Sequence, residues 1–331
     1  MSIFEESVSY RPFKYPFAAE GAKKHAIEMF WDSHQIELQD DIRQYRTEGG
    51  LTTPNRSHSQ NKRTIDTILC LFTELDKTVS EGYTKLLPYT KNNEVRMLLL
   101  TQAAREVTHT RSYALLAETL GFSDADWNLF HKYKSMVDKV DLISAEDGDL
   151  SRPLNYAKAL TRLHLSEGIG LFAAFATLLN FKRFGLLIGF NDVNQWSLQD
   201  ETFHVENNIK IVKAIRDEDL SYVENVELEK YTKNLVDKFS IVEEEFIEFI
   251  GDQEDLTKRE LSDYIKYLGE LRLFQSDYLD YSEVRQNPIE WMDWILSAGQ
   301  HDNFFEKRVT SYSHQRLSGE VDYSRYSKYI K

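Results

Sequence analysis

The order of hydrophobic and polar residues predicts a chain of long helices. Apolar side chains recur every three or four positions through most of the sequence, which is the period of one face of an α-helix. Proline and glycine, which end helices, number only 6 and 14. We therefore expect an all-α protein with helices over 17–46, 60–87, 93–120, 123–144, 152–183, 191–216, 221–250 and 256–282, and a short amphipathic piece at 289–296.

Four of these helices carry ionisable residues on a face that is otherwise apolar. Glu106, His109 and Tyr113 are separated by three, four and seven positions, so they project from the same side of their helix. Burying such groups without partners is costly, and a metal ion is one of the few available compensations. The other three helices carry Asp76, Glu167, and the pair Glu201 and His204.

Together these residues predict a dinuclear metal site. Two helices supply a Glu-x-x-His pair and two supply a single acid, the combination found in carboxylate-bridged metal sites of helix bundles. Each residue alone has a simpler interpretation, because a single acid is usually solvated and a single histidine can be a satisfied core residue. Oxygen and nitrogen donors without thiolate suit iron or manganese better than structural zinc.

Net charge and cysteine content limit the partners and the compartment that we expect for the protein. The formal net charge of −14 disfavours nucleic acid or an anionic membrane surface as the main partner. The single cysteine, Cys70, agrees with a reducing, cytoplasmic compartment and is interpreted as a core residue. Residues 1–13 lack the regions of a secretion signal, and the apolar run 168–181 is shorter than the roughly 20 residues that span a bilayer.

The motifs that carry these residues resemble the small, radical-generating subunit of class I ribonucleotide reductase, across most of the chain. That resemblance implies a ferritin-like bundle with a dinuclear metal site in a four-helix core, flanking helices and a flexible C-terminal tail. Asp76 resembles the family's first metal ligand. The other matching motifs are Glu106-x-x-His109-x-Arg111-Ser112-Tyr113, similar to a ligand pair followed by the radical tyrosine, and Ser166-Glu167-Gly168 with Asp200-Glu201-x-x-His204, similar to the second half of the ligand set.

The resemblance also implies an electron relay. Phe30-Trp31 is similar to the family's Phe-Trp pair, whose tryptophan relays an electron to the metal site, and Asp200 is similar to the acid that hydrogen-bonds within that relay. In the tail, Tyr312 resembles the tyrosine that passes the radical to the large subunit. The implied domains are a metal-binding domain at 1–300 and a tail at 301–331 that docks on the large subunit.

The implied activity is deoxyribonucleotide synthesis by a complex of two kinds of subunit. The reduced metal pair reacts with an oxygen-derived oxidant, and Tyr113 becomes a radical that oxidises a cysteine of the large subunit through Trp31 and Tyr312. The implied cofactor is dinuclear iron, manganese-iron or dimanganese. The implied partners are a second copy of the chain, the large (alpha) subunit and, where superoxide is the oxidant, an activating flavoprotein.

Three positions depart from the family pattern, and three other functions stay open. Leu171 replaces a frequent phenylalanine of the radical pocket, Ser197 places a hydroxyl where an aliphatic side chain is common, and Gln199 replaces an arginine before the Asp-Glu pair. These changes bear on radical stability and metal choice. A related two-metal oxidase of small molecules, an iron-binding bundle without radical transfer and an inert helical scaffold are the alternatives.

Overall fold

This computed structural model describes residues 2–127 and 133–295. The chain divides into two units, Met1–Glu290 and Trp291–Lys331, and the helices named below belong to the first. The predicted tail at 301–331, its Tyr312 and the predicted domain boundary at residue 300 lie outside the described residues.

Helices make up the regular structure of the described residues, which contain no β-strand beyond two isolated bridges. The all-α prediction is therefore confirmed. In chain order the elements are α1 (Pro16–Lys23), the π-helix η1 (Lys24–Glu28), the 3₁₀ turn η2 (Ser33–Gln35), α2 (Gln39–Arg46), α3 (His58–Leu86), α4 (Asn93–Leu120), α5 (Asp124–Trp127), α6 (Lys134–Ser144), α7 (Pro153–Gly168), α8 (Phe172–Arg183), α9 (Ile188–Glu218), α10 (Tyr222–Ile250), α11 (Lys258–Gln275) and the 3₁₀ turn η4 (Tyr281–Glu283).

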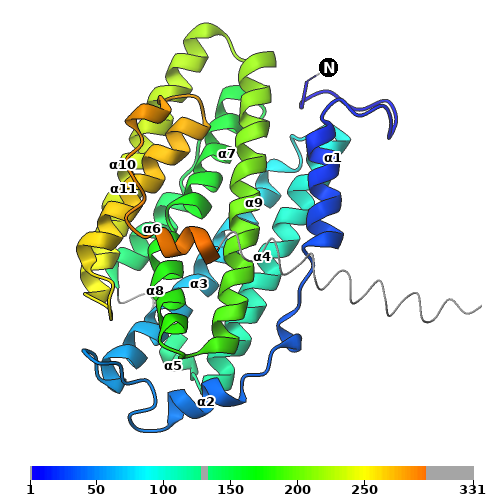
Figure 1. Cartoon of the computed structure of the whole chain (residues 1–331). Helices are drawn as coiled ribbons and strands as arrows, with labels where there is room; N and C mark the ends of the chain where they lie inside the picture. The colour runs from blue at the N-terminus through cyan, green and yellow to red at the C-terminus, as the bar shows by residue number, and fades with distance from the viewer. Residues whose placement is uncertain (1, 128–132, 296–331) are drawn as a thin grey trace, which may run out of the picture. The chain divides into compact units, whose positions relative to one another are not determined.

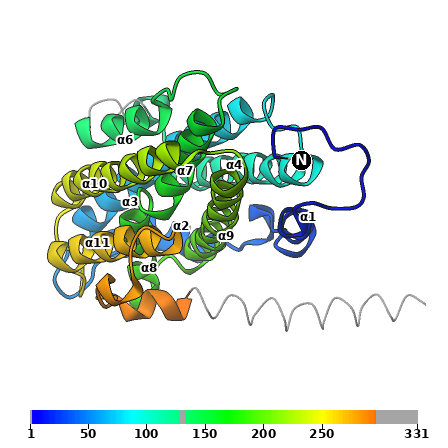
Figure 2. The same ribbon diagram turned by 90° about the horizontal axis from the view of Figure 1, so that it is seen from above.

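Four helices, α3, α4, α7 and α9, form the central bundle (Figure 1). Helix α4 packs against α3 and α9, and α7 packs against the same two helices. Helices α10 and α11 lie on one side of this bundle and α1 on the other, as both views show (Figures 1 and 2). The apolar faces recognised in the sequence meet in the middle, with Ile68, Leu99, Leu163 and Val205 at most 3% exposed.

Local signals set several helix ends. The Ser57 side chain accepts a hydrogen bond from the backbone N–H of Gln60, which satisfies one of the free donors at the start of α3. Asn92 caps α4 in the same way. Helix α4 ends at Gly121, whose φ of 97° is the left-handed conformation that glycine adopts readily.

Two helices that were predicted as continuous are interrupted. The expected helix over 17–46 stops near residue 28, after one π-helical turn, and regular α-helix resumes only at Gln39. The expected helix over 152–183 breaks after Gly168, where an added Cβ would lie 2.7 Å from the Arg272 Nε. Residues 128–132 lie outside the description, so α5 and α6 are described separately, and α11 ends at Gln275 instead of continuing to residue 282.

Two buried cations stabilise the break between α7 and α8. A broken helix leaves carbonyl groups without backbone partners. The Arg272 Nε donates to the carbonyl of Gly168 at 3.2 Å, and the Lys139 Nζ donates to the carbonyl of Gly170 at 3.2 Å. Lys139 also pairs with the buried Glu243. The sequence pattern could not predict the break, because these donors come from α6 and α11.

The most apolar stretch of the chain belongs to the core. By length and composition residues 153–183 could cross a membrane, but they are interrupted at 169–171 and the most apolar part is completely buried among the described residues. The burial agrees with the interpretation of this stretch as a core helix.

Candidate metal centre

The structure brings together all six residues predicted as metal ligands. Helices α3 and α7 each contribute one acid, while α4 and α9 each contribute a glutamate and a histidine. Every one of these side chains is at most 2% exposed, so none of the four carboxylates is the solvated acid of the simpler interpretation. The six are Asp76, Glu106, His109, Glu167, Glu201 and His204.

The ligand atoms form two overlapping groups. Within each group they lie within 4.8 Å of one another. Glu106 and Glu201 belong to both groups, which is the arrangement expected when two carboxylates bridge a pair of metal ions. The first group adds Asp76 and His109, and the second adds Glu167 and His204.

Both histidines direct Nδ1 into the cluster. The His109 Nδ1 lies 3.0 Å from a Glu201 oxygen, and the His204 Nδ1 lies 3.0 Å from a Glu106 oxygen. Each Nε2 atom points away from the cluster and has its own partner. His109 faces Asp200 at 3.1 Å, and His204 faces His25 at 3.2 Å. Such outer contacts fix the orientation of a ligating imidazole.

The hydrogen-bonding of the cluster fits a pair of cations. Asp76 Oδ2, Glu106 Oε1, His109 Nδ1 and both carboxylate oxygens of Glu201 are buried and, apart from the contacts between the two Nδ1 atoms and carboxylate oxygens of the cluster itself, have no hydrogen-bond partner among the described residues. Unpartnered buried acceptors are rare because they lose their hydration without compensation. Divalent iron or manganese ions would satisfy them with the oxygen and nitrogen ligands that these metals accept.

The shifted pKa values of the buried carboxylates also fit a site for cations. Burial, together with the Glu106 carboxylate, raises the pKa of Asp76 well above its ordinary value. Burial also raises the pKa of Glu167 to about 8. Burial acts in the same direction on Glu106, but His109 and His204 outweigh it and bring its pKa down to about 2. The metal-free cluster therefore retains protons that bound cations would displace.

We expect metal affinity to rise with pH, because Glu167 must lose its proton to act as a ligand. Its folded-state pKa of about 8 lies above the ordinary 4.5, so protonated Glu167 stabilises the metal-free fold below pH 4.5, and this stabilisation is lost as pH rises towards 8. Over the same interval the apparent affinity for Mn²⁺ should increase, by up to about tenfold per pH unit for each proton released. Competition titrations with a fluorescent chelator measure this slope, and a pH-independent affinity would contradict it.

Tyr113 occupies a closed pocket one helical turn beyond His109. It is 1% exposed, and its ring lies 4.6 Å from that of Phe72, measured between centroids. Its hydroxyl donates to the Asn194 Oδ1 at 3.3 Å. Burial and the Asp76 carboxylate raise the pKa of Tyr113 well above 10, so the phenol keeps its proton. Leu116, Leu171 and Phe175 are also buried.

Trp31 and Asp200 lie beside the predicted ligand His109. The Trp31 Nε1 donates to the Asp200 Oδ2 at 2.7 Å, and the same oxygen faces the His109 Nε2. The indole also stacks on the His109 ring, with centroids 5.7 Å apart and planes at 13°. Trp31 and Asp200, which were expected to belong to an electron relay, are thus adjacent to the predicted ligand His109.

Sequence reasoning missed several neighbours of the cluster. The Tyr83 hydroxyl lies 2.7 Å from Glu167 Oε2 and accepts a hydrogen bond from Asn208 at 2.6 Å. Tyr83 lies seven residues after Asp76 on α3, so helical spacing could have identified it. His25 lies in the π-helix η1, where the predicted regular helix gave no such signal. Of the family departures, Ser197 is buried beside the Tyr113 hydroxyl, and the Gln199 amide nitrogen has no hydrogen-bond partner among the described residues.

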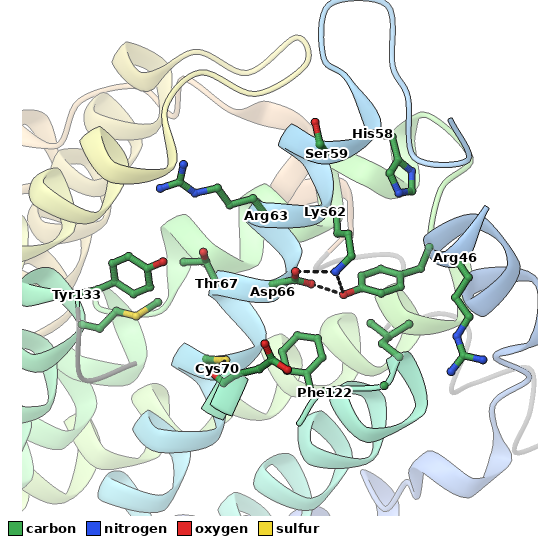
Figure 3. Close-up of a pocket in the computed structure, with 15 residues that line it drawn as sticks. Arg46, His58, Ser59, Lys62, Arg63, Asp66, Thr67, Cys70, Phe122 and Tyr133 are labelled. Atoms are coloured by element: carbon green, nitrogen blue, oxygen red, sulfur yellow. Dashed lines mark hydrogen bonds and ion pairs between the residues drawn. The ribbon is translucent and has the colours of Figure 1, made fainter. Parts of the chain in front are cut away.

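A cavity of about 530 Å³ lies away from these residues, between the N-terminal half of α3 and the C-terminal end of α4 (Figure 3). No predicted metal ligand lines it. Lys62, on its wall, pairs with Asp66 at 2.8 Å. Burial raises the pKa of the Cys70 thiol on the same wall to about 12, which agrees with the interpretation of this cysteine as a core residue.

Comparison with known proteins identifies the family. Residues 7–288 match the model of the family described as "Ribonucleotide reductase, small chain". The chain is 30% identical to a probable ribonucleoside-diphosphate reductase small subunit of Invertebrate iridescent virus 3, over 97% of this chain and 88% of the relative. It is 28% identical to the ribonucleoside-diphosphate reductase small chain of Nicotiana tabacum, over 91% of this chain and 87% of the relative.

Solved structures support the same fold. A class I ribonucleotide reductase from Bacillus halodurans, described as putative, superposes with a TM-score of 0.76 at 19% identity, over 85% of this chain and 99% of that one. The Rnr4 homodimer of Saccharomyces cerevisiae superposes with a TM-score of 0.71 at 17% identity, over 94% of this chain and 92% of that one. The fold, the buried cluster and the sequence matches agree, and the chain belongs to the ribonucleotide reductase small-chain family as a small subunit of ribonucleoside-diphosphate reductase.

Proposed function

We propose that this small subunit generates and stores a radical on Tyr113 and supplies it to the large subunit for deoxyribonucleotide synthesis. The observation that carries the proposal is the position of Tyr113, which is a fully buried phenol one helical turn from a cluster of four acids and two histidines. A phenoxyl radical needs such an enclosure, because contact with solvent or reductants would destroy it.

The six ligand residues would hold a pair of iron or manganese ions. Asp76 and His109 would hold one ion and Glu167 and His204 the other, while Glu106 and Glu201, which belong to both groups of ligand atoms, would serve both ions. When bound there, the metal pair supplies one-electron oxidation driven by oxygen or by superoxide from an activating flavoprotein. The ligand set suits an iron, manganese-iron or dimanganese pair, and metal analysis of the natively expressed protein distinguishes them.

The residues around Tyr113 determine how it is oxidised. Its raised pKa keeps the proton on the phenol, so loss of an electron from Tyr113 is accompanied by loss of that proton and leaves a neutral radical. Asn194 orients the hydroxyl through its hydrogen bond. Phe72 covers one face of the ring and excludes water from it.

Trp31, Asp200 and His109 would carry the electron between the metal site and the protein surface. Asp200 accepts a short hydrogen bond from the indole N–H of Trp31 and also contacts His109. Trp31 is 6% exposed and lines a surface cavity of about 430 Å³ together with Phe30 and Arg111. We propose that the path continues through Tyr312 to the large subunit.

We also propose that the subunit is a homodimer, as the yeast Rnr4 structure is described to be. An outer stripe of α4 exposes Leu100 (46%) and Val107 (51%), while η1 exposes Ile27 (70%) and the segment after it exposes Phe30 (64%). Contiguous exposed apolar side chains are typical of an interface. Leu100→Glu should shift the protein from dimer to monomer in light scattering. Ile241→Glu, at a 56% exposed residue of α10, is the control that should remain dimeric.

The proposed function is tested with the metal-free protein, loaded with Fe²⁺ and oxygen or with Mn²⁺ and superoxide. Electron paramagnetic resonance should then detect a tyrosyl radical, and the protein should support ribonucleotide reduction when the large subunit is added. A protein that forms no tyrosyl signal with any metal would contradict the proposal. Oxidation of a bound small molecule without the large subunit would instead favour a related two-metal oxidase.

A further inference from the structure

A buried arginine next to the metal ligands uses all three of its guanidinium nitrogens. Arg105 lies on α4, directly before Glu106, and is 5% exposed. Its Nε lies 3.3 Å from the Asp200 Oδ2. Its Nη1 donates to the carbonyl of Trp31 at 3.4 Å, and its Nη2 donates to the carbonyls of His25 and Met29, both at 3.2 Å.

The three carbonyls belong to the segment that leads into Trp31. The π-helix η1 ends at Glu28, and the chain then runs without regular structure to η2. Carbonyls at a helix end have no backbone donor, and when they are buried they need another one. Arg105 is the donor for the carbonyls of His25 and Met29 at the end of η1 and for that of Trp31 just beyond it, so the backbone that presents the indole is attached to α4.

Arg105 therefore links the three elements that supply the proposed relay. It binds the 25–31 segment, it stands on the helix that carries His109, and it pairs with Asp200 of α9. The Asp200 Oδ2 is the shared point, because it accepts from Trp31 at 2.7 Å and faces both His109 and Arg105. The guanidinium carbon also lies 5.7 Å from the centre of the Trp31 ring.

We propose that Arg105 is a positioning residue that sets the hydrogen bond between Trp31 and Asp200. Its role in radical transfer rests on the function proposed above, but its effect on the indole does not require a metal. Lysine keeps the charge near Asp200 and cannot serve four acceptors with one ammonium group. Glutamine loses the charge as well, so Arg105→Gln should perturb the indole more than Arg105→Lys.

The first experiment observes the indole N–H of Trp31 in the full-length, metal-free chain. Isotope-labelled tryptophan gives signals from the 5 tryptophans, and Trp31→Phe identifies the one that belongs to Trp31. In Arg105→Gln that signal should move upfield, and its exchange with solvent should become roughly tenfold faster, the factor expected when a charge-assisted hydrogen bond is weakened. Arg105→Lys should give a smaller change in the same direction.

Arg96→Gln, at an exposed arginine of the same helix, is the matched control and should leave the Trp31 signal unchanged. An unchanged chemical shift and exchange rate in Arg105→Gln would overturn the proposal. If Arg105→Gln does not fold, Arg105→Lys decides the question by the same two measurements.

The second experiment measures turnover with the large subunit for Arg105→Gln, Trp31→Phe and the double variant. If Arg105 acts through Trp31, the double variant should be no slower than Trp31→Phe alone. Losses that multiply would show that Arg105 acts elsewhere and would overturn the proposal. Absence of a tyrosyl radical in the unmodified protein would instead contradict the proposed function, and the indole measurements would still stand.

Discussion

Tyr113→Phe is expected to abolish the tyrosyl radical while leaving the metal site intact. The substitution removes only the hydroxyl, which donates to Asn194 and contacts no predicted ligand directly. The amide of Asn194 keeps its own hydrogen bond to the carbonyl of Phe175, so the pocket should retain its shape. Turnover with the large subunit should fall to below about one-hundredth of the unmodified rate, because the oxidisable group itself is gone.

A second buried phenol provides the matched control for this prediction. The Tyr83 hydroxyl lies within 2.8 Å of both oxygens of Glu167, so it donates a hydrogen bond directly to a predicted ligand. Its pKa is also raised well above 10, by burial and by Glu167. Tyr83→Phe should retain the radical signal. A signal that survives Tyr113→Phe and disappears in Tyr83→Phe would assign the radical to Tyr83 instead.

Glu201→Ala is expected to empty both halves of the metal site. Glu201 belongs to both groups of ligand atoms, and among the described residues its two oxygens have no hydrogen-bond partner outside the cluster. Loss of an outer-sphere partner typically lowers metal affinity by 10–100-fold, so loss of a bridging ligand should lower it by at least about 100-fold. Asp76→Ala should be milder, because Asp76 belongs to only one group and the ligands of the other remain.

Metal analysis after gel filtration, together with thermal unfolding, measures these effects. The unmodified protein should melt at a higher temperature with metal than without, because a ligand that binds only the folded state stabilises it. That difference should disappear in Glu201→Ala and persist in part in Asp76→Ala. Glu206→Gln, at an exposed glutamate of the same helix, is the control, and full metal content in Glu201→Ala would contradict the bridging role.

The bundle and its ligands could be predicted because both depend on local periodicity. In α4, for example, the three-residue separation of Glu106 and His109 places them on one face wherever the helix packs, and the apolar residues of that face direct it inward. The same reasoning identified Asp76, Glu167 and the pair on α9. The family resemblance, and not spacing, added Trp31 and Asp200, because they contact each other across 169 positions of sequence.

Only the tertiary structure decided the two helix breaks and the outer contacts of the site. In the sequence, 17–46 and 152–183 have ordinary helical patterns, but the free carbonyls in each region are satisfied by cations from distant elements: Arg105 in the first, and Lys139 and Arg272 in the second. Such donors have no fixed spacing from the groups they bind. The sequence by itself therefore determined which residues face the centre of the bundle, and the packing of separate helices determined the geometry in which Trp31, His25 and Tyr83 meet the ligands.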